Sequence, residues 1–254
     1  MSVRHCHAAL STALRQAVKW GWIDRSPADR ASPPPVPSRE IEPPTPEQIV
    51  ALIAEMDRTD HDLASMVFVA ATTGCRRGEL CGLRWTDIDL SGATLTVRRS
   101  ITDTTQGVTE KDPKTHRSRR ISLDPATMAA LVAQRERMAT RAEACGLVVG
   151  PDAYVWSQDR ACAVPCRPNR VTDAFRGVRN RLGFTDLDFH HLRHFAATTL
   201  AGAGVDVRTI AGRLGHANPA ITLKTYAHFL EATDRQAAEV MGRIAFRPDP
   251  TTAE

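Results

Sequence analysis

A chain of 254 residues, 42% of them hydrophobic, is long enough to bury a substantial core, as one large domain or as a domain with an appendage. Its 33 lysines and arginines nearly balance its 29 acidic residues, so the formal net charge of +4 does not by itself indicate a nucleic-acid partner. No apolar run approaches the roughly 18 residues of a membrane helix. The N-terminus also has no apolar signal segment, and both observations predict a soluble, cytoplasmic protein with no membrane partner.

The six cysteines are expected to be reduced thiols, as is usual in a cytoplasmic protein of this size. Only Cys162 and Cys166 have a spacing close to that of metal ligands, and no second pair or suitable histidine accompanies them. The sequence therefore predicts no metal site.

The N-terminal segment predicts one amphipathic helix, over residues 5–20, with Leu10 and Leu14 on its apolar face. A segment this short cannot bury a core of its own. Seven prolines between Pro33 and Pro46 exclude a helix there and predict an extended, fairly stiff linker. The expected organisation is an appended helix in residues 1–30, a linker in 31–44, one domain in 45–245 and a polar tail in 246–254.

The domain is predicted to begin with a helix that Thr45 caps, with Pro46 as its first residue and Gln48 as the capping-box partner. A helix over residues 62–72 is apolar nearly all round, which predicts the buried central helix of the domain. From about residue 93 to 123 the pattern changes to period two, with TLTVRR and RRISL as strands of a small antiparallel sheet. Further helices are predicted over residues 126–145, 168–182 and 231–244.

Positive charge is concentrated in two stretches of the chain. Residues 108–120 contain five Lys or Arg against two acids, and residues 166–181 contain five Arg against one Asp. Such stripes in a nearly balanced chain fit a DNA-facing surface, although ordinary solvated elements would look similar. The candidate DNA-binding residues are Lys111, Arg117, Arg119, Arg167, Arg170 and Arg176.

Residues 190–226 predict three short helices that present polar side chains. His190 and Arg193 are three residues apart and so share one face of the first helix, which ends at Gly202. The second helix ends at Gly215, which leaves His216 in a loop.

Asn218 and Pro219 are a predicted N-cap and first residue of the third helix, which carries Tyr226. A tyrosine hydroxyl has a pKa near 10, so as a nucleophile it needs a base and nearby positive charge. Arginine and histidine can supply both, and the same cations would hold the non-bridging oxygens of a phosphodiester. This chemistry needs no metal.

Three sequence boxes in this order resemble the active-site motifs of the tyrosine recombinases, the phage integrase family. The first, TTGCRRGELCGL, contains Arg76 with Glu79 three residues later. The second, KDPKTHRSRRISL, offers Lys114 within PKT. The third runs from HHLRH through LGH to Tyr226, ten residues after the LGH histidine. The boxes span roughly residues 44 to 245.

The resemblance implies an α+β fold, mostly α, with a small antiparallel β-sheet, and site-specific DNA recombination without metal or ATP. Tyr226 would attack one strand of duplex DNA, leaving a 3′-phosphotyrosyl link and a free 5′-hydroxyl. Arg76 and Arg193 would stabilise charge on the equatorial oxygens of the phosphate. The implied catalytic residues are Arg76, Lys114, His190, Arg193, His216 and Tyr226.

In the family this lysine lies on a β-hairpin between the first and third boxes. Lys114 would act as the general acid on the 5′-oxygen, with Lys111 as a competitor because the register of that hairpin is not fixed by sequence. His190 would accept the tyrosine proton or orient a phosphate oxygen, and His216 would hydrogen-bond the scissile phosphate. The implied partners are double-stranded DNA and further copies of the chain, as a homotetramer on paired sites and a monomer when free.

The segment around WGWIDRSP resembles the last helix of the core-binding domain of full-length integrases, so the chain is expected to be a truncated form. Two alternatives remain open at this point. One is a catalytically silent DNA-binding or regulatory remnant, and the other is a type IB topoisomerase, which would use nearly the same residues. The long basic hairpin favours an integrative mobile element over a chromosome-resolving recombinase.

Overall fold

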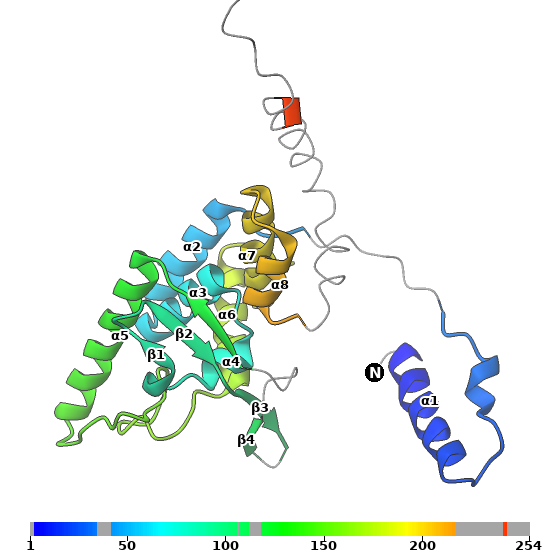
Figure 1. Cartoon of the computed structure of the whole chain (residues 1–254). Helices are drawn as coiled ribbons and strands as arrows, with labels where there is room; N and C mark the ends of the chain where they lie inside the picture. The colour runs from blue at the N-terminus through cyan, green and yellow to red at the C-terminus, as the bar shows by residue number, and fades with distance from the viewer. Residues whose placement is uncertain (1–2, 35–41, 106, 112–117, 217–240, 243–254) are drawn as a thin grey trace, which may run out of the picture. The chain divides into compact units, whose positions relative to one another are not determined.

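The computed structural model describes residues 3–34, 42–105, 107–111, 118–216 and 241–242 (Figure 1). The chain divides into two compact units, Met1–Glu42 and Pro43–Glu254. Within the described residues, no helix combines the length and the apolar character that crossing a bilayer would require. Of the helix predicted over residues 231–244 only residues 241–242 are described, and the helix predicted to carry Tyr226 lies outside the described residues.

The first unit is a helix with a short return segment. Helix α1 (Val3–Lys19) packs against the 3₁₀ helix η1 (Pro27–Arg30), and the His7 ring lies 3.0 Å from the Ala31 carbonyl oxygen. The predicted helix is therefore present. Its apolar face is only partly covered within this small unit, since Leu10 is 61% exposed.

Four helices among the described residues of the second unit begin at a side-chain N-cap, supplied by Thr45, Asp60, Asp124 and Asp206. Helix α2 begins at the predicted capping box, in which Thr45 N donates to Gln48 Oε1 at 2.9 Å and Gln48 N donates to Thr45 Oγ1 at 3.3 Å. Helix α3 has nine buried residues and packs on α2, α5 and α7, as predicted for the central helix. The helix bounds are α2 Pro46–Asp57, α3 His61–Thr73, α4 Arg77–Cys81, α5 Pro125–Glu143, α6 Pro168–Arg181, α7 His191–Gly202 and α8 Val207–Leu214.

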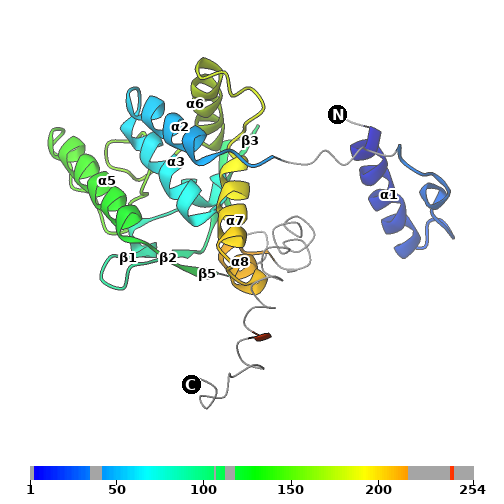
Figure 2. The ribbon, with the colours of Figure 1, turned by 90° about the horizontal axis from the view of Figure 1, so that it is seen from above.

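The described residues of this unit also form two small antiparallel sheets. Strands β1 (Ile88–Asp89), β2 (Thr94–Val97) and β5 (Arg119–Ser122) form one sheet in the order β1-β2-β5. Figure 2 shows these strands along one side of the helices, with α8 beside β5. The two predicted strands are thus confirmed and pair with each other, with Leu95 opposite Ile121.

A second hairpin separates β2 from β5 and was not predicted. Strands β3 (Ser100–Thr104) and β4 (Gly107–Lys111) pair with each other, and β3 lies against α4 (Figure 1). Their sequences, SITDT and GVTEK, are mostly polar, and only Ile101 is buried. A period-two apolar pattern is therefore absent, although the hairpin is formed.

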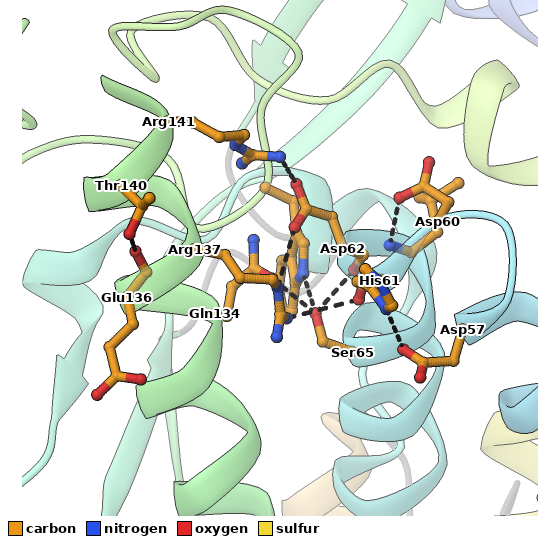
Figure 3. Close-up of polar contacts among 12 residues, drawn as sticks. Asp57, Asp60, His61, Asp62, Ser65, Gln134, Glu136, Arg137, Thr140 and Arg141 are labelled. Carbon is orange, nitrogen blue, oxygen red and sulfur yellow. Dashed lines mark hydrogen bonds and ion pairs between the residues drawn. The ribbon is translucent and has the colours of Figure 1, made fainter. Parts of the chain in front are cut away.

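A buried polar network ties α3, α5 and the segment before α6 together. The Ser65 hydroxyl accepts from Trp156 Nε1 at 2.9 Å and donates to Gln134 Oε1 at 3.0 Å. Gln134 Nε2 in turn donates to the Val155 carbonyl at 3.1 Å. Figure 3 shows Ser65 and Gln134 facing each other, beside the ion pair of Asp62 with Arg137. All these groups have partners, so the network fixes the position of α5 relative to α3 and to the segment before α6.

We expect Gln134→Leu to destabilise the domain by about 2 kcal/mol, because the volume is nearly kept while Ser65 and the Val155 carbonyl lose a buried partner. Urea unfolding followed by tryptophan fluorescence measures this change. Glu136→Ala, on the exposed face of the same helix, is the control and should change the free energy of unfolding by less than about 0.5 kcal/mol. Equal stability of the Gln134 variant and the parent would show that the network contributes nothing net.

Candidate active site

A cavity of about 560 Å³ lies where α4, β3 and the N-terminal ends of α6 and α7 meet. Three predicted catalytic residues, Arg76, His190 and Arg193, line it. The first lies in the TTGCRRGEL box and the other two in the HHLRH box, more than 100 residues later. The fold therefore brings the first and third boxes to one hollow.

Arg76 is held at the edge of this cavity by Glu79. Arg76 is the N-cap of α4, where its backbone N–H donates to Glu79 Oε2 at 2.8 Å and its Nη1 donates to Glu79 Oε1 at 2.8 Å. The Glu79 side chain is 1% exposed, whereas that of Arg76 is 26% exposed. The buried carboxylate thus fixes the position of the Arg76 side chain and leaves part of its guanidinium exposed to the cavity.

Glu79 has a second cationic partner, Arg119 on β5. Arg119 Nη2 donates to Glu79 Oε2 at 2.6 Å and Nη1 donates to Oε1 at 3.0 Å. Burial alone would raise the pKa of Glu79, but its hydrogen bonds and ion pairs with Arg119 and Arg76 outweigh that effect, so the pKa is lowered. Glu79 is therefore ionised at neutral pH.

Arg193 is the most deeply buried cation of the cavity, at 4% exposure. Its Nη1 donates to the Gly74 carbonyl at 2.8 Å, whereas Nη2 is buried without a hydrogen-bond partner among the described residues. Burial, followed by repulsion from Arg76, lowers the pKa of Arg193 to about 10, so the group remains charged at neutral pH. A buried cationic donor without a partner is costly, and an anion in the cavity would satisfy it.

Gly74 allows this arrangement because no side chain fits there. It ends α3 with a φ of +68°, and a Cβ atom at this position would lie 2.4 Å from Leu214 Cδ2 of α8. The glycine of the TTG box therefore lets α8 approach closely while its carbonyl binds Arg193.

His190, at the start of α7, has a lowered pKa. Burial and then the charge of Arg193 lower the pKa of His190, so its ring is neutral at pH 7 and can accept a proton. Asp188 orients the start of α7, since its Oδ1 accepts from the backbone N–H groups of His190 at 2.7 Å and His191 at 3.2 Å. His194 contacts the His190 ring edge to face, with centroids 5.0 Å apart.

His216 follows directly after α8, whose C-cap Gly215 has a φ of +68°. Burial, followed by the charges of Arg193 and Arg76, lowers its pKa to about 4. The ring therefore lies within the electrostatic influence of the arginines that line the cavity. Lys114 and Tyr226, the remaining predicted catalytic residues, are outside the described residues, as is Arg117.

The predicted DNA-binding residues divide into two groups. Arg119 is a correction: its side chain is 8% exposed and bonded to Glu79, so it is not a DNA-facing residue. The signal was present in the sequence, because strand residues two apart share a face and Ile121 is apolar. Lys111 is exposed at the end of β4, and three arginines of the second stripe are partly exposed and paired with acids: Arg167 with Asp103, Arg170 with Asp60 and Arg176 with Asp173.

The base of the β3–β4 hairpin is held by a cluster that the sequence did not indicate. Glu110 Oε2 accepts from Arg84 Nη2 at 3.1 Å and from the Tyr154 hydroxyl at 3.0 Å, while Oε1 lies 3.3 Å from Arg99 Nε. Glu110 precedes Lys111, so these contacts fix the end of β4 from which the lysine projects. Tyr154 is buried, and its hydroxyl bonds to Glu110 and Arg84 in this cluster.

The lowered pKa values predict a loss of stability in mild acid. The unfolded chain binds protons at histidines with an ordinary pKa near 6.5, whereas burial lowers the folded-state pKa of His194 and His216 to about 4. Between these values the unfolded state holds more protons, so the free energy of unfolding should fall as pH drops from 7 to 5. Urea unfolding of the DNA-free protein at both pH values measures the slope. His194→Gln should flatten it, and an unchanged slope would contradict the assignment.

Comparisons with known proteins place this site in a family. The model of the phage integrase family matches residues 44–232, which contain all the boxes. The chain is 29% identical over 197 residues to a tyrosine recombinase XerC-like protein of Caldanaerobacter subterraneus subsp. tengcongensis, covering 72% of this chain and 50% of that protein. It is also 29% identical over 244 residues to the integrase of Mycobacterium phage D29, covering 95% of this chain and 62% of the relative.

Solved structures share the fold at low sequence identity. The Tn1549 transposon integrase, solved in complex with transposon right end DNA, superposes with a TM-score of 0.75 at 21% identity, over 96% of this chain and 79% of that one. The XerA recombinase gives a TM-score of 0.59 at 21% identity, over 98% and 85%. The fold is therefore mostly α with small antiparallel sheets, as predicted, and the family match over residues 44–232 means that the chain belongs to the phage integrase family.

Proposed function

We propose that this chain cleaves and rejoins duplex DNA through Tyr226 in site-specific recombination. The observation that carries the proposal is the convergence of Arg76 and Arg193 on one cavity, with a buried Arg193 Nη2 that has no partner among the described residues. A phosphodiester oxygen is an acceptor of the required charge and geometry. The chain spans 50% and 62% of the length of the two curated relatives described above.

In the proposed reaction the Tyr226 oxygen forms a bond to phosphorus while the bond from phosphorus to the 5′-oxygen breaks. The two arginines hold the equatorial oxygens, where negative charge increases in the transition state. Neutral His190 accepts the tyrosine proton, and Lys114, or in its place Lys111, donates a proton to the leaving 5′-oxygen. A 5′-hydroxyl from a partner duplex reverses these steps. Each step exchanges one phosphodiester for another, so no external energy source is required.

The proposed substrate is double-stranded DNA, held by the exposed Lys111 and by Arg167, Arg170 and Arg176 of the second basic stretch. Each of these arginines pairs with a carboxylate in the absence of DNA, and phosphates would replace those partners. Two relatives of the same fold were solved bound to DNA, the Tn1549 integrase and the lambda integrase dimer on a COC′ core site. We extend the proposal to a homotetramer on paired sites in the cytoplasm, with the chain monomeric when free.

We propose the same domain organisation along the chain that the sequence predicts. Residues 45–245 would form the catalytic domain, and residues 246–254 a polar tail. Residues 1–30 would be the last helix of a core-binding domain, joined by the linker 31–44. The exposed apolar residues of the first unit, Leu10, Trp20 and Trp22, support this role, because such a helix packs on the rest of its domain.

The nucleophile is tested by relaxation of supercoiled plasmid in EDTA without ATP. The parent should relax the plasmid and form a covalent protein–DNA adduct, and Tyr226→Phe should do neither while binding DNA with an affinity within about threefold of the parent. Tyr154→Phe is the matched control, since the chain has two tyrosines, and it should retain the adduct. An adduct in the Tyr226 variant would place the nucleophile elsewhere. An inactive parent that stays inactive with a core-binding domain joined to it would favour a silent remnant.

The general acid is tested with DNA that carries sulfur in place of the 5′-bridging oxygen, because a thiolate leaves without a proton. On ordinary DNA, loss of the acid should slow cleavage by about 10²- to 10⁴-fold. Lys114→Ala should show this loss and recover on the sulfur substrate, whereas Lys111→Ala should do neither. The opposite pattern would assign the acid to Lys111, and no rescue of either variant would exclude both lysines.

A further inference from the structure

Arg119 lies on the inward face of β5. Its side chain is 8% exposed, and Ile121, two residues along the same strand, is 1% exposed. Arg120, between them, points outward and is 64% exposed beside Asp89. The strand therefore presents two neighbouring arginines to opposite environments.

Arg119 joins two parts of the candidate active site. Besides its two hydrogen bonds to Glu79, it donates from Nε to the Arg213 carbonyl in the last turn of α8 at 2.9 Å. Gly215 lies directly on the guanidinium, since a Cβ atom there would be 2.9 Å from Nη1 and 3.1 Å from Cζ of Arg119. The Arg119 guanidinium thus contacts both the carboxylate that binds Arg76 and the turn that precedes His216.

These contacts limit how Glu79 can bind Arg76. A carboxylate and a guanidinium without other partners form a two-pronged pair that uses both oxygens. Here Arg119 bonds both oxygens of Glu79, and Arg76 reaches the carboxylate with its backbone N–H and with Nη1. Arg76 is therefore oriented by Glu79 and still lines the cavity.

We propose that Arg119 is a positioning residue for strand cleavage: it holds Glu79 so that Arg76 stays available to the phosphate, and it fixes the α8 turn that carries His216. This role rests on the proposed function of the site. It differs from a DNA contact, because it predicts an effect on the cleavage rate at saturating DNA rather than on affinity.

The test measures affinity and the single-turnover cleavage rate at saturating protein for Arg119→Met, with Arg120→Met as the matched control. Arg119→Met should bind DNA within about threefold of the parent and cleave it at least about 100-fold more slowly, as expected for a misplaced charge-stabilising group. Arg120→Met should cleave at the parental rate. Rates are expressed per folded molecule, with the folded fraction taken from circular dichroism.

A second substitution separates positioning from loss of structure. In Arg119→Met the Glu79 carboxylate loses its Arg119 partner and should bind the Arg76 guanidinium with both oxygens, which withdraws Arg76 from the phosphate. The neutral amide of an added Glu79→Gln change should bind Arg76 less tightly, so the double variant should cleave at least about tenfold faster than the single variant. Arg119→Lys should recover less, because an ammonium lacks the planar fork that reaches Glu79 and Arg213 together. Parental cleavage by Arg119→Met, a defect confined to affinity, or no recovery in the double variant would overturn the proposal.

Hydrogen exchange gives a readout that does not depend on DNA cleavage. Loss of Arg119 should speed amide exchange across residues 207–216, and loss of Arg120 should not. If the parent forms no Tyr226-dependent adduct, the proposed function has failed, and exchange still tests the link between Arg119 and α8. An unchanged exchange rate in Arg119→Met would contradict the proposed link between Arg119 and α8, even if the enzyme proves active.

Discussion

The buried carboxylate of Glu79 is the interaction on which the candidate active site depends. An ionised carboxylate at 1% side-chain exposure is tolerated only when its oxygens are fully paired. Two guanidinium groups and one backbone N–H supply those partners, and they come from α4 and β5. Removing any one of these partners would leave charge uncompensated inside the domain, so the positions of Arg76 and Arg119 are linked through this one group.

The same cluster accounts for the electrostatics of the cavity. Three arginines and one glutamate leave a local excess of positive charge, which disfavours protonated imidazole nearby. His190 and His216 accordingly have lowered pKa values, with burial as the first cause and arginine charge as the second. A site that keeps its arginines charged and its histidines neutral at pH 7 is suited to bind an anion while accepting a proton.

The described site residues Arg76, His190 and Arg193 lie on or directly before helices. The proposed general acid follows the end of β4 in the sequence, and the proposed nucleophile follows the end of α8. Lys111 closes β4 directly after Glu110, which Arg84 and Tyr154 hold, and β5 begins with Arg119, which Glu79 holds. The segment that contains Lys114 therefore starts and ends at residues anchored by ion pairs. These anchors limit how far the intervening chain can reach from the domain.

The helices of the domain could be predicted because their signals are local. Thr45, Pro46 and Gln48 mark the start of α2 within four residues, and the apolar sequence of α3 identifies the buried centre without reference to any partner. The hairpin β3–β4 could not be predicted in this way. Its strands are polar, and it forms through pairing between them and contact with α4, which no local pattern records.

The sequence by itself determined the family, the mostly helical fold and the candidate catalytic residues. The reason is that the boxes around Arg76, Lys114, His190 and Tyr226 are short motifs with characteristic internal spacing. Tertiary structure alone decided which charged side chains of the described residues are buried and which face solvent. Five arginines and lysines in one stretch look alike in sequence, yet Arg119 is buried on Glu79 and Arg120 faces solvent. The physical reason is that the role of a charge depends on its partners and its burial, and both are set by segments distant in the chain.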